Sequence, residues 1–431
     1  MTGAEAAAEA ATSGAGPAEM ATSTSPPPQS ALRLPGYRVH FATYLLAMMA
    51  DNIEHVISYW VAFQKFHSNA LGGFAVISHW LPFLGFSVSV GALNDRFDSR
   101  RLIQIGMVMF VAASVGWGYL FLTGTLEMWH AALLLVLHGC AGVLWQTSNQ
   151  MLLYDIVGPA ALPSAVRLNA SARHLGFLVG PALGGAIMLG LGPTYGIFLN
   201  AVFYLPLLLW LIRAPYGRHY RAAGTTGLKR PVRGLADILQ TIRDVRGVPV
   251  IGTMLVLAGG ASFFIGNSYQ AQMPRFASDL GHGDQGVLYS MLLGADAAGA
   301  LTAGFLLEST RGRLAMTARS ALVLSLLWAA SLFAFACVGF YPITLVLLFC
   351  AGFFELSFSS MAQTIVQLNA PNEIRGRVLG LFNMSALGLR AFSGITVGLV
   401  GSILTVHVSL ALACAAFIVV MSVMLIRQRK P

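Results

Sequence analysis

The stretch GALNDRFDSRRLI, residues 91–103, is a short charged turn between two long apolar runs. These runs, 71–93 and 102–124, are long enough to cross the ~30 Å hydrocarbon core of a bilayer, which takes about 20 helical residues. The pattern predicts two transmembrane helices joined on one side of a membrane. The rest of the chain repeats this design.

The composition agrees with a membrane protein. The chain has 431 residues, of which 56% are hydrophobic and 10% are charged, whereas a soluble domain has about 25% charged residues. The net charge of +9 does not indicate nucleic-acid binding, because the basic residues lie between apolar runs and form no solvated basic patch. We therefore expect the lipid bilayer as a partner and no nucleic acid.

Apolar runs of spanning length recur along the whole chain. They predict an all-α membrane protein with about twelve transmembrane helices. The expected spans are 38–63, 71–93, 102–124, 129–152, 167–189, 193–212, 249–273, 284–307, 315–339, 342–366, 376–400 and 403–426.

A long polar segment in the middle of the chain divides the spans into two halves. We expect an N-terminal bundle over 37–212, a basic cytoplasmic linker over 213–248, and a C-terminal bundle with a short cytoplasmic tail over 249–431. Residues 1–36, rich in Ala, Ser, Gly and Pro, predict a disordered cytoplasmic tail. Within the linker, LADILQTIRDVR is either an amphipathic helix on the inner leaflet or a plain connection.

The distribution of basic residues predicts the orientation. If both termini face the cytoplasm, nearly all Lys and Arg residues fall on the inner side, as the positive-inside rule requires. Lys65 and Arg275 fall outside, and Arg173 and Arg390 lie within the membrane. We expect a multi-pass protein of the cell (inner) membrane with both termini in the cytoplasm.

Motifs for catalysis and metal binding are missing from the sequence. The four cysteines lie inside apolar runs without metal-ligand spacing. No Gly-x-x-x-x-Gly-Lys-Ser/Thr loop, Gly-x-Ser-x-Gly or His-Glu-x-x-His motif occurs. We therefore expect that the protein is not an enzyme and that it has neither a cofactor nor a metal site.

The turn at 91–103 resembles the signature loop of the major facilitator superfamily, Gly-x-Leu-Ala-Asp-Arg-x-Gly-Arg-Arg/Lys. Asn94 and Asp98 depart from the pattern, and GFLLESTRGR at 304–313 is a weaker copy in the second half. The resemblance implies two pseudo-symmetric six-helix bundles, with Asp95 capping the eleventh helix where EIRGRVLG begins. The expected residues of this cytoplasmic gate are Gly91, Asp95, Arg96, Arg100, Arg101 and Arg377.

The fifth span contains GFLVGPALGG, residues 176–185, which resembles the helix motif of proton-coupled exporters in this superfamily. The resemblance implies a proline bend and a tight contact at the interface of the two halves. Two loops, 154–176 and 368–384, resemble those of siderophore exporters and macrolide-type efflux proteins. The expected antiporter-helix residues are Gly176, Gly180, Pro181, Gly184 and Gly185.

Polar residues within the spans predict the functional site. An ionised side chain at mid-membrane costs about 2.5–3.5 kcal/mol on insertion scales, so it should face protein or water and have a partner. The first span carries such groups on one helix face, and Arg173, His174 and Arg390 are candidate partners; the alternative is a purely structural acid–base pair. The expected proton-coupling residues are Asp51, Glu54, His55, Arg173 and Glu355.

The resemblance to the superfamily also implies that the first, fourth, seventh and tenth spans line a central cavity. His138 stands near the position where related drug exporters often carry a coupling arginine, so their coupling scheme does not transfer. The expected substrate-cavity residues are Tyr44, Met48, Ser58, His138, Trp145, Asn149, Phe263, Asn267, Gln270, Ser359 and Gln363.

Taken with the resemblance, these features predict a monomeric secondary transporter that exports a small amphiphilic organic compound in exchange for protons by alternating access. Uptake or facilitated diffusion of a nutrient is an alternative. A membrane sensor or assembly protein that keeps the fold without transporting is another.

Overall fold

The computed structural model describes residues 29–66, 69–217, 232, 234–266, 268–280, 287–309, 315–393 and 404–427. Within these residues the regular structure is helical and contains no strand. Most of the predicted disordered tail lies outside the described residues. Its last part differs from the expectation, because Ala31–Arg33 form a 3-10 turn in which the buried Ala31 donates its N–H to Ser164 Oγ at 2.8 Å.

The N-terminal half consists of α1 (Pro35–Phe66), α2 (Asn69–Arg96), α3 (Ser99–Thr123) and α4 (Met128–Arg213). The helix α4 is broken twice, at Gly158 (φ 66°) and Gly192 (φ 75°), where a left-handed backbone favours glycine. A proline follows each of these glycines and begins the next helical stretch, a position where its missing N–H costs nothing. The helix α4 therefore forms three segments, 128–157, 159–191 and 193–213.

The C-terminal half repeats this layout in shorter pieces. Each predicted span corresponds to a described helix or segment, and six of the described helices are long and apolar enough to cross a membrane. A π-helical turn, Met384–Gly388, links α12 to α13. The helices are α6 (Pro249–Phe264), α7 (Ser268–Ala271), α8 (Met273–Asp279), α9 (Val287–Ser309), α10 (Ala318–Cys337), α11 (Tyr341–Asn369), α12 (Arg375–Asn383), α13 (Arg390–Ser393) and α15 (Val406–Arg427).

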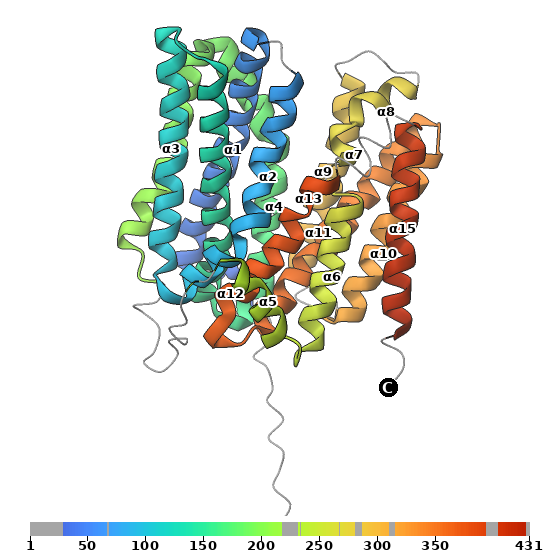
Figure 1. The fold of residues 1–431 in the computed structure, drawn as a ribbon. Helices are drawn as coiled ribbons and strands as arrows, with labels where there is room; N and C mark the ends of the chain where they lie inside the picture. Colours follow the sequence, from blue (N-terminus) through green and yellow to red (C-terminus); the bar gives the residue numbers. More distant parts are fainter. Residues whose placement is uncertain are drawn as a thin grey trace, which may run out of the picture.

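The two halves stand side by side as two helical bundles (Figure 1). Each half buries aromatic residues in its own core, for example Phe110 and Tyr204 in the first half, and Trp328 and Phe417 in the second. The linker contributes a short helix, α5 (Leu235–Asp244), at one end of the bundles. We call this end the α5 end, and the end that carries α8 the α8 end.

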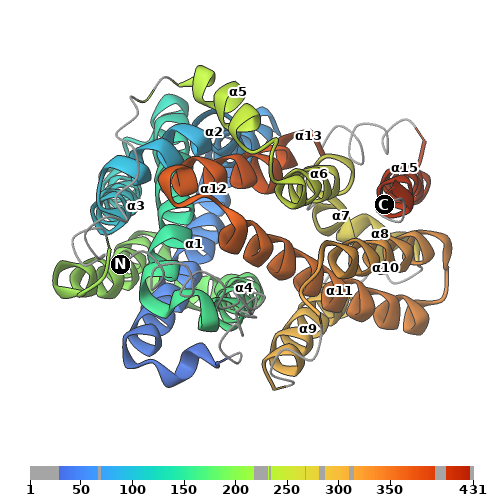
Figure 2. The same cartoon turned by 90° about the horizontal axis from the view of Figure 1, so that it is seen from below.

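Near the α5 end, α2 and α12 join the two halves at close range. A Cβ atom on Gly91 would collide with the carbonyl oxygen of Gly376, and one on Gly380 would collide with that of Ser87. Helices approach this closely only where both present small residues. Viewed from below, α12 lies beside α2, on the N-terminal side of the molecule (Figure 2).

Candidate functional site

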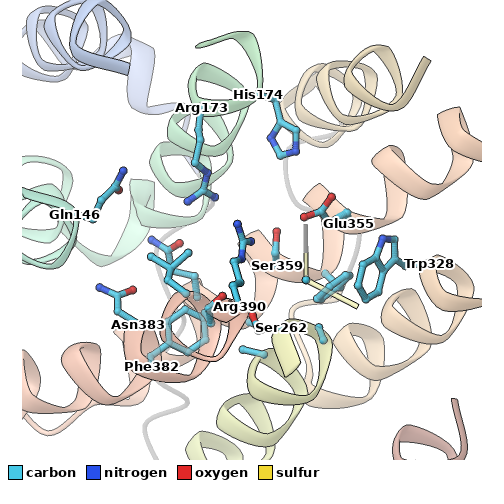
Figure 3. A pocket seen from close by; sticks show the side chains of 18 of the residues that line it. Gln146, Arg173, His174, Ser262, Trp328, Glu355, Ser359, Phe382, Asn383 and Arg390 are labelled. Carbon is cyan, nitrogen blue, oxygen red and sulfur yellow. Dashed lines mark hydrogen bonds between the residues drawn. The ribbon is translucent and has the colours of Figure 1, made fainter. Parts of the chain in front are cut away.

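A central cavity, here called the larger cavity, lies between the two halves (Figure 3). Of the predicted site residues, Arg173, Gln270, Glu355, Ser359 and Gln363 line it. Its wall also contains amides and aromatic rings that the sequence prediction did not include. These are Gln146, Gln150, Phe177, Trp328, Phe358, Phe382 and Asn383.

A smaller cavity adjoins the larger one and is lined mostly by residues of the N-terminal half. Met48, Asp51 and Trp145, all predicted site residues, line it together with His79 and Trp80. Some residues line both cavities and therefore stand between them. These are Gln146, Arg173, Phe177, Leu387 and Arg390.

His138 connects the two acids of α1. Its Nε2 lies 2.9 Å from Asp51 Oδ1, and its Nδ1 lies 2.8 Å from Glu54 Oε1. An imidazole can donate to two carboxylates only when both of its nitrogens carry a proton. All three groups are buried, so the geometry favours a compact charged cluster, which we call the Asp51–His138–Glu54 cluster.

Glu54 faces away from both cavities, unlike the sequence prediction. Its Oε2 accepts a hydrogen bond from Ser114 Oγ of α3 and is 3.5 Å from Asn200 Nδ2 of the segment 193–213. Ser58 and Tyr44, also predicted to face the cavity, are each 2% exposed and line neither cavity. The reason is geometric. Residues at i, i+3 and i+7 of a helix cover a broad stripe of its surface, and on α1 this stripe extends from the smaller cavity into the core of the N-terminal half.

Two other predicted cavity residues also lie elsewhere, and the position of a third is not described. Asn149 is 4% exposed and lines neither cavity. Phe263 is 38% exposed, lines neither cavity, and packs against Phe264 and Phe392. Asn267 lies outside the described residues.

His55 belongs to a group of three imidazoles together with His79 and His138. Their ring nitrogens lie within 4.8 Å of one another, and they are the described residues that could hold a metal ion. Both nitrogens of His138 are already occupied by carboxylates, so a metal would have to displace one of them. The donor set as it stands does not present three free imidazole nitrogens.

Another buried acid, Asp296, lies in the C-terminal half. Asp296 accepts a hydrogen bond from Gln270 Nε2 at 2.8 Å and longer ones from Tyr269 Oη at 3.3 Å. The same hydroxyl is 3.5 Å from Glu355 Oε2, so Tyr269 links the buried acid to the wall of the larger cavity.

The predicted gate residue Asp95 contacts the start of α12. Its carboxylate accepts hydrogen bonds from the backbone N–H groups of Gly376 (2.6 Å) and Arg377 (3.2 Å), and Arg377 Nη1 lies 3.0 Å from it. An acid is favourable at a helix N-terminus because unpaired N–H groups point at it. The other face of Arg377 reaches Asp237 of α5 at 3.3 Å.

The other basic residues of the gate motif make contacts only within the N-terminal half among the interactions described. Arg100 pairs with Asp98, the N-cap of α3, and donates to the carbonyl of Ala214 at 2.6 Å. Arg101 donates to Gln104 at 3.1 Å, and Arg96 is exposed. They brace the turn, whereas Asp95 joins the two halves.

The weaker copy of the motif makes a second contact between the halves. Glu308, at the end of α9, accepts hydrogen bonds from Ser164 Oγ at 2.6 Å and Arg167 Nη2 at 3.1 Å. Asp95 and Glu308 thus occupy corresponding positions of the repeated motif in the two halves. The carboxylate of each accepts hydrogen bonds from residues of the opposite half.

The glycine motif of the fifth span packs differently from what the resemblance implied. Gly176, Gly180 and Gly184 face α1, where added Cβ atoms would press on Met48, Asn52 and Ile53. The contact therefore lies inside the N-terminal half and not at the interface of the halves. Gly185 faces open space, and Pro181 is exposed with helical backbone angles around it. Small residues let this segment approach the helix that carries Asp51.

Several residues of the site were outside the sequence prediction. Asn200 is a polar residue in an otherwise apolar span, a signal that could have been used. Ser114 gave no such signal because small polar residues are common in transmembrane helices, and Gln146 does not stand out because it begins a polar run, 146–150, in its span. The sequence predicts Arg390 as a candidate partner for the acids of α1; among the described residues of the structure it forms no ion pair with them and lines both cavities.

Comparison with known proteins agrees with this architecture. The chain is 24% identical over 368 residues to the multidrug efflux pump Tap of Mycobacterium tuberculosis (strain ATCC 25618 / H37Rv), covering 82% of this chain and 84% of that protein. It is 24% identical over 339 residues to the enterobactin exporter EntS of Citrobacter koseri, covering 75% of this chain and 74% of the exporter.

Solved structures show the same fold. The human organic anion transporter MFSD10 superposes with a TM-score of 0.69 at 14% identity, covering 90% of this chain and 99% of that one. The Escherichia coli fucose:proton symporter FucP superposes with a TM-score of 0.67 at 12% identity, covering 90% and 98%. The sequence profile of one family, described as transmembrane secretion effector, matches residues 27–431. The chain belongs to this family of multi-pass membrane transporters, within the major facilitator superfamily, and is not an enzyme.

Proposed function

We propose that this transporter exports a small amphiphilic organic compound and uses proton entry to drive the export. The observation that carries the proposal is the position of His138 between Asp51 and Glu54, which places three titratable groups in one hydrogen-bonded cluster. Asp51 touches the smaller cavity, whereas Glu54 is sealed in the core. A proton that reaches Asp51 changes the charge of the whole cluster.

The groups around this cluster determine how it responds to a proton. The rings of His55 in α1 and His79 in α2 both contact the His138 ring. Phe110 also packs on His138, and Tyr204 stacks on Phe110. Arg173 and Arg390 line the smaller cavity together with Asp51. In this proposal Arg173 modulates Asp51 from across the cavity, and Glu355 is an acid of the other half that lines the larger cavity.

The orientation follows from the positive-inside rule. We assign the α5 end and both termini to the cytoplasm of a cell (inner) membrane. In this assignment the contacts of Asp95 and Glu308 hold the cytoplasmic side closed. Rocking of the halves over 37–212 and 249–431 would break both contacts and open that side, within a single monomer.

Transport of a panel of amphiphilic fluorescent dyes into everted membrane vesicles tests the proposal. A pH gradient should drive accumulation by the wild type, and Asp51→Asn and Glu54→Gln should each abolish it while the protein still folds. Asp279→Asn and Glu373→Gln, the same substitutions at acids outside the cluster, should transport normally. Gradient-driven accumulation that persists in both cluster variants would rule out the proposed coupling.

A further inference from the structure

Two arginines face each other across the space between the halves. Arg173 belongs to the segment 159–191 of α4, and Arg390 is the first residue of α13. Both line the larger and the smaller cavity. Figure 3 shows their side chains pointing into the same space from opposite sides, with Glu355 to one side of them.

Neither arginine is paired with an acid of the described part of the chain. Among the residues that the structure describes, no carboxylate oxygen lies within 4 Å of either guanidinium group. Arg390 Nε is buried without a hydrogen-bond partner, and its guanidinium carbon stands 5.2 Å from the centre of the Trp80 ring. Charged groups at membrane depth need a partner, so these two donors are available to a ligand.

The nearby acids are already engaged with other groups. Asp51 is held by His138, and Asp296 by Gln270 and Tyr269. Glu355 is the acid among the described lining residues of the larger cavity, against the two arginines. The charge of the described cavity wall therefore favours a negative ligand group.

We propose that Arg173 and Arg390 form an anion clamp, one arginine from each half, that binds a carboxylate, sulfonate or phosphate group of an amphiphilic substrate. Guanidinium groups match such groups with paired, charge-assisted hydrogen bonds. Phe177, Trp328 and Phe358 supply apolar wall for the remainder of the molecule. The anion clamp names the substrate class of the proposed transporter and rests on that proposal.

The anion clamp also links binding to the rocking motion. Two guanidinium groups repel each other when the halves approach, and an anion between them removes this repulsion. An empty cavity therefore resists closure, whereas a filled one can close. The inside-negative membrane potential then favours outward movement of the anion.

Three adamantane probes of nearly equal size test the anion clamp: adamantane carboxylate, adamantyl ammonium and adamantanol. The unfolding midpoint of the purified full-length protein in detergent, followed by tryptophan fluorescence, reports binding of each probe without any transport. The carboxylate should raise the midpoint of the wild type, and the other two probes should raise it less. In Arg173→Gln and Arg390→Gln the carboxylate should bind about tenfold more weakly or worse, as for loss of a hydrogen bond to a charged group.

Three further variants distinguish anion recognition by the two arginines from misfolding and from cation binding. Arg275→Gln removes an exposed arginine that pairs with Asp279 and should bind the carboxylate like the wild type. Arg173→Lys keeps the charge and should retain part of the binding, which separates charge recognition from misfolding. Glu355→Gln should strengthen carboxylate binding, whereas a cation site would lose its ligand.

The anion clamp is excluded if the carboxylate stabilises the wild type no more than the other probes do. Equal stabilisation of the wild type and both glutamine variants excludes it as well. Carboxylate binding that depends on the arginines, together with transport that ignores a pH gradient, would keep the clamp and reject only the proton coupling.

Discussion

Asp95 and Arg377 are 282 residues apart in the chain, yet they form an ion pair with a distance of 3.0 Å in which both side chains are almost fully buried. The same carboxylate accepts hydrogen bonds from the backbone N–H groups of Gly376 and Arg377 in the first turn of α12. The Asp95 side chain of the N-terminal half thus pairs with the Arg377 guanidinium and caps the N-terminus of α12, both in the C-terminal half. Any opening at the α5 end must break these contacts together.

Asp95→Asn should therefore favour opening at the α5 end. The substitution keeps the shape of the side chain but weakens hydrogen bonds to a charged group, costing the closed arrangement roughly 1–3 kcal/mol. Spin labels at Phe97 and Leu368, exposed positions on the two halves, should report a larger population of long distances in a cysteine-free background. Asp98→Asn, in the same turn but paired within the N-terminal half, should leave the distances unchanged.

Glu308→Gln should produce a smaller shift in the same direction. Glu308 accepts from Ser164 and Arg167, but its side chain is 15% exposed and water can replace the lost contacts. The same pair of spin labels gives the measurement. Combined with Asp95→Asn, the effect should exceed that of either single variant. A double variant that behaves like the wild type would show that these contacts do not control the opening.

His138→Gln should destabilise the protein as well as uncouple it. The substitution leaves two buried carboxylates without the imidazole between them, and breaking a buried pair costs about 3–5 kcal/mol. The unfolding midpoint should fall sharply. Adding Asp51→Asn and Glu54→Gln to His138→Gln should recover much of the stability but none of the gradient-driven transport, since the stranded charges are gone while no group is left to carry the proton.

Gly180→Ala and Gly185→Ala should have opposite effects on stability. A Cβ at Gly180 would lie 2.5 Å from that of Asn52, whereas one at Gly185 would meet nothing within 4 Å. Overpacking costs about 1–3 kcal/mol, while replacing a helical glycine by alanine without a clash gains about 0.5–1 kcal/mol. Thermal unfolding should show a lower midpoint for Gly180→Ala and an equal or higher one for Gly185→Ala. Equal midpoints would indicate that α1 and the segment 159–191 can separate freely.

Asp237→Asn should loosen the attachment of α5 to the rest of the protein. The carboxylate of Asp237 holds Arg377 at 3.3 Å, and α5 is a short helix that also packs on α2 and α12. Amide hydrogen exchange in Leu235–Asp244 should become faster, while that of α12 should change little because Asp95 still caps it. Asp244→Asn, at the end of the same helix, is the matched control.

The sequence was sufficient for the architecture. Apolar runs of spanning length predict the helices, since a bilayer accepts few other backbone structures. Gly91 and Asp95 at their spacing predict the fold of the superfamily, and the copy at 304–313 predicts its two halves. These features are local or repeat along the chain, and therefore they can be read without coordinates.

The partners of the polar residues could not be read in this way. Periodicity places Asp51 and Glu54 on one face of α1, but only the packing of α3 and α4 directs one to a cavity and the other to Ser114. The glycine motif likewise led to the prediction of a tight contact at the interface of the two halves, whereas its glycines pack against α1 inside the N-terminal half.

The sequence by itself therefore determined that the chain spans a membrane as two related bundles and that acids and arginines lie at membrane depth. Only the tertiary structure decided that His138 lies between both acids of α1 and that Arg173 and Arg390 line the cavity wall. The physical reason is that hydrophobic spans and helix periods are properties of neighbouring residues. The neighbour of a buried charge is set by helix rotation and packing between distant segments.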